Sequence, residues 1–286
     1  MKIPHSVDRK PALTQTNTYK IYHIKIDPSR GRLPNVDKPL NTYTPELDQW
    51  IRNGVKHALI DVDNTLVKAN IAELYLRMRK NSFKRSWAWR LWLAGFAAFW
   101  APIYLLLDAM NREWFQRAFY RRFRAFSPEQ IDQASEELVQ EKCRTRLISY
   151  THQLIPYLQK NNINVILLST NIEPVVKRMA QRYGVDYLCL PVLQNGTAAQ
   201  VGLDQLRDFK KNHATRYPSE SLLAVADSKH DLPVLQHAAY SIVIEDRPLS
   251  WMKKIGGTYI RVPGALFQHG HDYTENRTHT ENIPSS

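Results

Sequence analysis

Two aspartates separated by one residue are the first candidates for chemistry in this sequence. The segment DVDNT at 61–65 places Asp61 and Asp63 directly after the apolar run 58–60. Just beyond a strand, two such carboxylates can converge on one polar volume, where one attacks phosphorus and the other protonates the leaving oxygen. A close carboxylate pair also favours a bound cation, because the cation offsets the charge repulsion. By itself, the pair is equally typical of a turn or a helix cap.

Hydroxyl and amide side chains form a second group of candidates. Ser169, Thr170 and Asn171 follow the apolar run 163–168. A hydroxyl between a strand and a helix can hydrogen-bond a phosphoryl oxygen, and backbone amides there add further donors. Ser and Thr also cap helices for structural reasons. We therefore predict phosphate binding by all three residues, with Asn171 serving either as a ligand or as a cap.

A third group of candidates follows the apolar run 222–226, in the segment ADSKHDLP at 226–233. Carboxylate oxygens suit Mg²⁺, which prefers one or two carboxylates, several waters and the substrate phosphate. We predict that Asp227 meets this ion from the side opposite Asp61, and that Asp231 holds a metal-bound water or orients its neighbours. His230 could act as a base, although a solvated or packing role is commoner for such a histidine.

The elements that must position these motifs alternate between strand and helix. Helical patterns at 147–159, 174–183, 232–237 and 247–255 separate strand-like runs at 58–60, 163–168, 186–190, 222–226, 241–244 and 259–262. Strands that are apolar on both faces and alternate with helices indicate a parallel sheet covered on both sides. The sequence thus predicts a Rossmann-like α/β fold, in which ligands bind beyond the carboxyl ends of the strands. All three motifs stand at such ends.

The chain divides into four predicted parts. Residues 44–65 and 145–265 form the catalytic core, which opens with a helix that starts at Thr44. Residues 66–144 interrupt the alternation with helical, aromatic and basic sequence, and so predict an α-helical cap inserted after the first catalytic strand. Within this cap, Ser127 and Gln130 mark a helix start. The polar residues 1–43 predict a flexible arm, and 266–286 a disordered tail.

The composition constrains the compartment and the partners. The chain has 286 residues, a hydrophobic content of 43% and a net charge of +12, which attracts polyanions, anionic membranes or phosphorylated substrates. No nucleic-acid recognition motif accompanies the charge, so nucleic acid is not expected as a partner. Two cysteines and the absence of a signal-peptide pattern at the start favour a cytoplasmic location.

Together the three motifs carry a resemblance to a known family. The segments DVDNTLV at 61–67, LLSTNIEPVVKRMAQRYGVD at 167–186 and ADSKHDLPVL at 226–235 resemble the haloacid dehalogenase (HAD) superfamily in order, spacing and strand-end placement. The similarity is to the phosphoserine-phosphatase-like branch, subfamily IB, and it covers about residues 55–265. It implies a Mg²⁺-dependent phosphomonoester hydrolase.

The resemblance also implies roles for individual residues. Asp61 would be the nucleophile and a metal ligand, forming a phosphoaspartyl intermediate. Asp63 would be the acid and base, and would bind Mg²⁺ through its main-chain carbonyl. Ser169 would hold the transferring phosphoryl group. Asp227 would complete the metal site, supported by Asp231.

The family also uses a lysine between the second and third motifs, which neutralises charge on the phosphate and the nucleophile. The candidates are Lys210 and Lys211, and we favour Lys210. The usual Gly-then-Lys spacing is not clean, because Gly202 is followed by Leu203, Asp204 and Gln205.

The predicted cap contains an uncharged run at 91–107, LWLAGFAAFWAPIYLLL, with basic residues on both sides. As a helix this run would extend about 25 Å, short of a hydrocarbon core of about 30 Å. Positive charge at both ends disfavours a simple span and favours an element lying on an anionic surface. Residues 84–124 therefore predict contact with an anionic membrane; a buried cap helix and a true span are the alternatives.

The substrate class follows from the same segment. We expect a lipid or amphipathic phosphate, with the protein peripheral to the inner face of a membrane. One alternative is a soluble phosphatase for a phosphorylated amino acid or sugar. Another is a non-catalytic membrane-binding or nucleic-acid-binding protein on the same fold, which would not need the acid Asp63.

Overall fold

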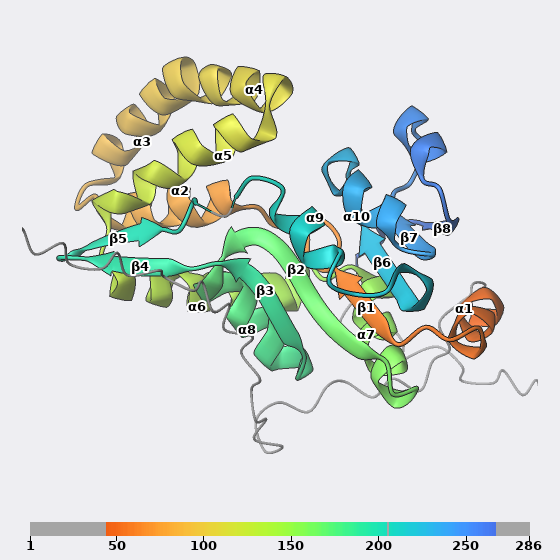
Figure 1. Cartoon of the computed structure of the whole chain (residues 1–286). Coiled ribbons are helices and arrows are strands. Elements are labelled where there is room, and N and C mark those ends of the chain that lie inside the picture. Colours follow the sequence, from red (N-terminus) through yellow and green to blue (C-terminus); the bar gives the residue numbers. More distant parts are fainter. Residues whose placement is uncertain (1–43, 205, 267–286) are drawn as a thin grey trace, which may run out of the picture.

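Six parallel strands form the central sheet of the computed structural model, which describes residues 44–204 and 206–266. The predicted arm 1–43 and all but the first residue of the predicted tail 266–286 lie outside the described residues. The strand order is β3-β2-β1-β6-β7-β8 (Figure 1). The strands are β1 (His57–Ile60), β2 (Asn164–Ile172), β3 (Asp186–Leu190), β6 (Leu222–Ala226), β7 (Tyr240–Ile244) and β8 (Thr258–Val262). The predicted parallel α/β sheet is confirmed.

Strand β1 lies at the point where the direction of strand addition reverses. It pairs with β2 on one side and with β6 on the other. From there the chain builds outward through β3 on one side and through β7 and β8 on the other. The loops that leave neighbouring strands at such a reversal diverge and leave a crevice, where open α/β sheets bind ligands.

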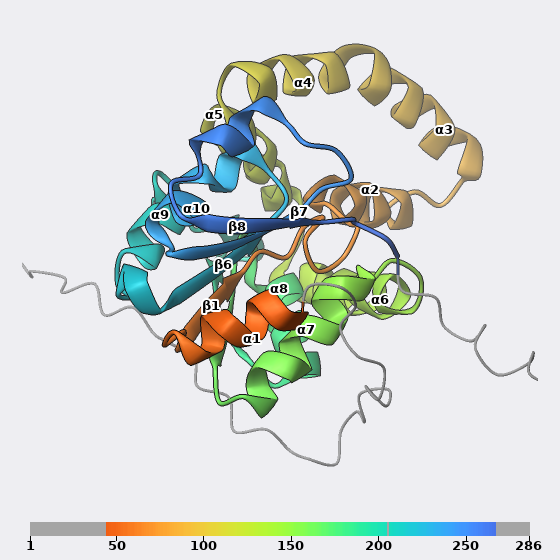
Figure 2. The same ribbon diagram turned by 90° about the vertical axis from the view of Figure 1, so that its right-hand side faces the viewer.

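Helices cover both faces of this sheet. The helices α7 (Ser149–Lys160) and α8 (Glu173–Tyr183) lie on one face, and the short helices α9 (Phe209–Ala214) and α10 (Leu232–His237) on the other (Figure 2). The first described helix is α1 (Thr44–Arg52), which also lies on the α7 side (Figure 2). Gly184 ends α8 in the left-handed conformation, at a φ of 63°, and its amide bonds the last carbonyls of the helix.

The predicted helical insertion after β1 is also confirmed. It contains α2 (Ile71–Asn81), α3 (Ser86–Gly95), α4 (Ala101–Met110), α5 (Arg112–Tyr120) and α6 (Pro128–Thr145). A π-helical turn, η1 (Phe96–Trp100), joins α3 to α4, and a 3₁₀ turn, η2 (Arg121–Ala125), follows α5. Ser127 and Gln130 form the expected capping box of α6. Ion pairs from Arg178 in α8 to Asp132 and Glu136 tie α6 to the core.

The structure differs from the predicted elements in three places. An antiparallel hairpin of β4 (Val192–Asn195) and β5 (Ala198–Val201) was not predicted, although Asn195-Gly196 is a strong hairpin signal. Strand β2 continues beyond 168 to Ile172, with a shift of register against β3, so Ser169 to Asn171 belong to the strand end. The segment 247–255 forms only the 3₁₀ turn η5 (Ser250–Lys254), since Pro248 and Gly256 confine it.

Candidate active site

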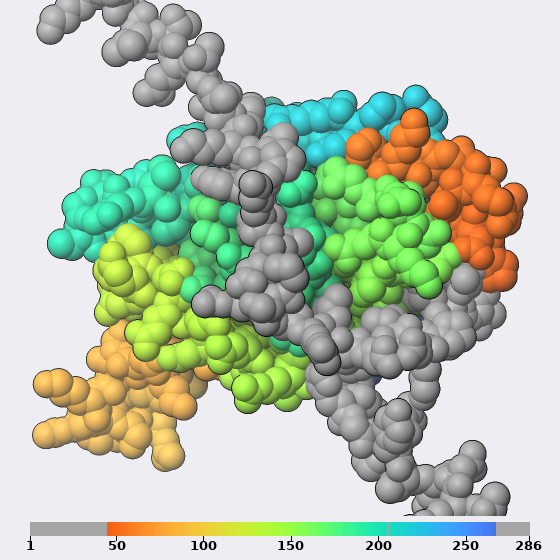
Figure 3. Space-filling view, turned by 90° about the horizontal axis from the view of Figure 1, so that it is seen from below, coloured from red at the N-terminus to blue at the C-terminus, as the bar shows by residue number. Residues whose placement is uncertain are grey.

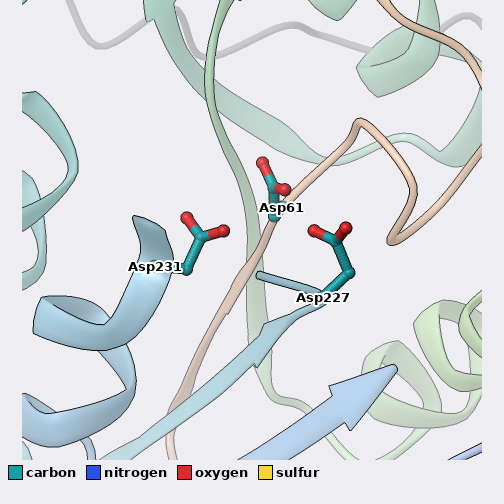
Figure 4. Close-up of side chains that lie close together, drawn as sticks. All are labelled: Asp61, Asp227 and Asp231. Atoms are coloured by element: carbon teal, nitrogen blue, oxygen red, sulfur yellow. The ribbon is translucent and has the colours of Figure 1, made fainter. Parts of the chain in front are cut away.

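Three carboxylates from two loops converge beyond the carboxyl ends of β1 and β6 (Figure 4). One oxygen of each of Asp61, Asp227 and Asp231 lies within 4.8 Å of the others. The pairing of β1 with β6 causes this convergence: Ile60 lies opposite Val225, and the amide of Asp61 continues the ladder to the Val225 carbonyl at 2.9 Å. Asp231 ends the 3₁₀ turn η4 (Lys229–Asp231), which folds its carboxylate back toward Asp61.

Lys210, in the first turn of α9, lies between two of these carboxylates. Its Nζ donates to Asp61 Oδ1 at 2.7 Å and also to Asp231 Oδ1. The side chain of Lys210 is mostly buried, whereas the neighbouring Lys211 is exposed on the wall of the same cavity. The geometry thus separates the two lysines that the sequence left as alternatives.

The second oxygen of Asp61 has different surroundings. The hydroxyl of Thr65 lies 3.4 Å from Asp61 Oδ2 and 3.3 Å from Asp227 Oδ1. A hydroxyl has one hydrogen, so Thr65 donates to one of these oxygens at a time. One oxygen of Asp61 is therefore held by the lysine, and the other faces Asp227. Thr65 is fully buried, and no role was predicted for it from the sequence.

Asp63 is held by Asn171. Both oxygens of Asp63 accept from Asn171 Nδ2 at 3.0 Å, and the amide of Ile172 donates to Asn171 Oδ1 at 2.7 Å, which fixes the orientation of that side chain. Burial raises the pKa of Asp63 to about 6, although Asn171 opposes the shift. Asp63 can therefore exchange a proton near neutral pH. Asn171, predicted to bind phosphate, uses its side chain to orient Asp63.

The electrostatics of the site show an excess of negative charge. Burial raises the pKa of Asp61 well above its usual range against the effect of Lys210, and neighbouring carboxylates add to the rise. Burial and then Asp231 raise the pKa of Asp227 to about 7. Burial alone would lower the pKa of Lys210, but Asp231 and Asp61 outweigh it and raise that pKa. A divalent cation would offset the remaining repulsion, and these oxygen donors fit one.

The predicted phosphate-binding residues occupy different positions at the end of β2. Ser169 is buried and lines the cavity, and its Oγ accepts from the Asn171 amide at 3.0 Å, which leaves the hydroxyl hydrogen available as a donor. Thr170 also lines the cavity, and in addition it contacts the cap. Gln116 Nε2 donates to its hydroxyl and Tyr120 OH to its carbonyl, both at 2.7 Å. Helix α5 is therefore bonded directly to the catalytic edge of the sheet.

A cavity of about 390 Å³ lies between core and cap, and it is lined by Asp61, Asp63, Ser169, Thr170, Lys210, Asp227 and Asp231. His230 and Ser228 join the carboxylates on the core side. On the cap side, the cavity is lined by four residues that were not predicted as site residues from the sequence: Asp108, Arg112, Glu113 and Gln116. Arg112 pairs with Asp108 at 2.8 Å and Arg117 with Glu113 at 2.7 Å. The one available signal was that Asp108 and Glu113 are the only acidic residues within 84–124.

The family follows from a comparison of the sequence with known families. The family model for haloacid dehalogenase-like hydrolases matches residues 58–236, which span all three motifs. The chain belongs to this family. A search of curated proteins finds no match for this HAD hydrolase.

Solved structures agree in fold at low sequence identity. A substrate-bound phosphoserine phosphatase is 16% identical, with a TM-score of 0.54, and the match covers 72% of this chain and 92% of that one. A HAD family hydrolase from Salmonella enterica subsp. enterica serovar Typhi is also 16% identical, with a TM-score of 0.52 and coverage of 78% and 76%. A phospho-aspartyl intermediate analogue of phosphoserine phosphatase is 14% identical, with a TM-score of 0.51 and coverage of 74% and 95%.

Proposed function

We propose that this HAD hydrolase is a magnesium-dependent phosphomonoester hydrolase that uses Asp61 as its nucleophile. The observation that carries the proposal is the grouping of Asp61, Asp227, Asp231 and Lys210 at one end of the sheet, on the wall of a cavity of about 390 Å³. Such a site concentrates charge that can bind a metal ion and a phosphoryl group together. Asp63 stands on the same cavity wall, in position to serve as acid and base.

In the first half of the reaction, a carboxylate oxygen of Asp61 attacks phosphorus. The bond from phosphorus to the ester oxygen breaks, and protonated Asp63 gives its proton to the departing alcohol. A pKa of about 6 suits Asp63 to this exchange near neutral pH. The product of this half is a phosphoaspartate on Asp61 and a free alcohol.

In the second half, water attacks the phosphoaspartate. Asp63, now a carboxylate, takes a proton from this water, the bond between phosphorus and Asp61 breaks, and inorganic phosphate leaves. The hydrogen bonds from Asn171 keep Asp63 in one orientation for both halves. In the HAD superfamily, which this chain resembles in its motifs, an aspartate at the position of Asp63 distinguishes phosphatases from relatives that cleave carbon–halogen bonds or pump ions.

Charge on the phosphoryl oxygens would be stabilised by Ser169 and Lys210 as donors. Asp61, Asp227 and Asp231 would hold the metal ion, together with the main-chain carbonyl of Asp63. When bound, Mg²⁺ supplies positive charge that neutralises the phosphate and offsets repulsion among the carboxylates. Lys210 would offset the repulsion between Asp61 and Asp231 and hold both carboxylates in orientation throughout.

The proposal includes a substrate class and a location. We assign the enzyme a lipid or amphipathic phosphomonoester and a cytoplasmic position at the inner face of a membrane. The apolar and basic segment 84–124, beside the cavity, supports the substrate class. Cys143 and Cys189, the two cysteines of the chain, are not joined by a disulfide, in agreement with a reducing compartment. A soluble phosphorylated amino acid or sugar is the competing substrate class.

The test is phosphate release from a panel of lipid and soluble phosphomonoesters, with and without Mg²⁺. We expect release that stops on chelation and returns when Mg²⁺ is restored. Mg²⁺ should also raise the melting temperature of the protein, because it binds only the folded cluster, and Asp227→Asn should abolish that rise. No release from any ester, with no thermal shift, would leave a binding protein as the better explanation.

A further inference from the structure

One surface of this enzyme is apolar and is left uncovered by the residues that the structure describes. Helix α3, the π-helical turn η1 and helix α4 form one continuous element, Ser86–Met110, which we call the apolar arch (Figure 2). It is the one helix of the described residues long and apolar enough to cross a membrane, and only 6% of its most apolar stretch is buried. In the view from below, its golden residues project beyond the body of the molecule (Figure 3).

The outer side of the apolar arch consists of large hydrophobic side chains. Leu91, Phe99, Ile103, Leu105, Leu106 and Met110 are 47% to 73% exposed. Single exposed apolar residues are ordinary, but a contiguous group of this kind marks an interaction surface. The element therefore differs from the buried cap helix that was one alternative interpretation of its sequence.

The inner side of the apolar arch is fixed to the rest of the cap. Tyr104 is buried and lies edge-on to Phe119 of α5, and Phe96 lies next to Tyr75 of α2. The guanidinium of Arg122 lies over the Trp100 ring at 4.2 Å from its centroid. Crossing a bilayer would break these contacts and pull α3 away from α2. The packing favours an element that lies flat on a membrane with both ends on one side.

The charges around the apolar arch indicate which kind of surface it binds. Residues 84–124 contain eight basic and two acidic residues, a net charge of +6. Of the eight, only Arg112 and Arg117 form a salt bridge within the part of the chain that the structure describes. Exposed basic residues such as Arg85 and Arg90 remain for other partners. An apolar face with a cationic margin suits an anionic bilayer, where hydrocarbon lies beneath a negative headgroup layer.

The apolar arch ends at the catalytic cavity. Asp108, in the last turn of α4, and Arg112, in the first turn of α5, both line that cavity, while Met110 between them is exposed. We infer that the apolar arch lies in the plane of an anionic bilayer and brings the phosphate of a membrane lipid into the cavity at its edge. This inference rests on the proposed phosphatase function for the delivery step only. A cavity of about 390 Å³ accommodates a headgroup, so the acyl chains would stay in the bilayer.

The first test is flotation of the full chain with vesicles of phosphatidylcholine alone or of an equimolar mixture with phosphatidylglycerol. We expect flotation with the anionic vesicles only, and its loss in the double variant Leu105→Glu, Leu106→Glu. Leu193→Glu is the matched control, because Leu193 is half exposed on β4, away from the apolar arch. Failure of the wild type to float, or equal flotation of the double variant, would overturn the docking.

Two further experimental outcomes would indicate a different role for the outer side of the apolar arch. Protein that resists extraction by alkaline carbonate would indicate a span instead of an in-plane element. A dimer in size-exclusion chromatography that the double variant abolishes, without flotation, would indicate that a second copy of this chain covers the face. We expect extraction by carbonate and the same elution volume for the wild type and the double variant.

The second test separates delivery from catalysis. Phosphate release from phosphatidic acid in anionic vesicles is compared with release from soluble p-nitrophenyl phosphate. The double variant should lose about tenfold or more of the lipid rate, because docking raises the local substrate concentration, and keep the soluble rate. An unchanged ratio of the two rates would overturn the delivery step. If the wild type releases phosphate from neither ester, the phosphatase proposal fails while flotation still decides the docking.

Discussion

The catalytic site and the apolar arch break the ordinary rule of burial in opposite directions. At the site, charged groups are buried: Asp61 and Asp231 are buried carboxylates, and both accept from the mostly buried Lys210. On the apolar arch, hydrophobic groups such as Phe99 and Leu105 are exposed. Buried charge is costly unless it is paired, and exposed apolar surface is costly unless it is covered. At the site, Lys210 pairs with two of the carboxylates within the fold, whereas the outer side of the apolar arch is left uncovered by the residues that the structure describes.

The largest expected effect is at the site. Asp61→Asn keeps the shape of the side chain and removes the proposed nucleophile, so kcat should fall by about 10⁴-fold or more. The variant should melt at or above the wild-type temperature, since it also removes one repelling charge. Phosphate release and thermal melting measure the two effects. Asp204→Asn, at an exposed carboxylate, is the control, and full activity in Asp61→Asn would remove Asp61 from its role.

The same contrast predicts different stabilities for two phenylalanines in the cap. Phe123 is fully buried, so Phe123→Ala should lower the free energy of unfolding by about 3–5 kcal/mol. Phe99 is 73% exposed on the apolar arch, so Phe99→Ala should change the free energy of unfolding by no more than about 0.5 kcal/mol. Urea unfolding in the absence of lipid measures both values. A large loss for Phe99→Ala would mean that the fold itself covers the face.

Substitutions of the neighbouring residues Lys210 and Lys211 test which lysine serves the site. Lys210→Met should lower kcat by about 10²- to 10³-fold, because it removes the donor to Asp61 that is also the proposed donor to the phosphoryl group. Lys211→Met, at the exposed neighbour, should change kcat by no more than about twofold. Initial rates on p-nitrophenyl phosphate with Mg²⁺ give both numbers. Equal effects would contradict the assignment of Lys210, rather than Lys211, as the lysine that serves the site.

The smallest effect concerns the junction between the two regions. Gln116→Leu removes the hydrogen bond from α5 to Thr170, and should lower kcat/KM by about three- to tenfold through looser closure of the cap. Gln133→Leu, on the exposed side of α6, should leave kcat/KM unchanged. Steady-state kinetics with a soluble ester checks both variants. No change in Gln116→Leu would mean that cap closure does not depend on this contact.

Local sequence patterns predicted the elements that are regular and buried. The strand β6 and the helix α10 lie where their apolar runs and the Pro233 helix start placed them, since packing and propensity agree there. The end of β2 was misjudged, because continued pairing with β3 kept Ser169 to Asn171 in the strand. Propensity does not encode such pairing. The segment 247–255 was misjudged for a local reason, because Pro248 and Gly256 confine it to the turn η5.

By itself the sequence determined the catalytic edge: three motifs at the ends of three strands, whose parallel pairing forces their side chains together. It also contained the apolar run and the charges beside it. Only the tertiary structure decided that Asn171 orients Asp63, that Lys210 and not Lys211 bonds Asp61, and that cap residues close the cavity. It also placed the apolar run on the outside. The hydrogen bonds of the site and of its junction with the cap join positions 50 to 149 residues apart, where no local periodicity can specify which side chains meet.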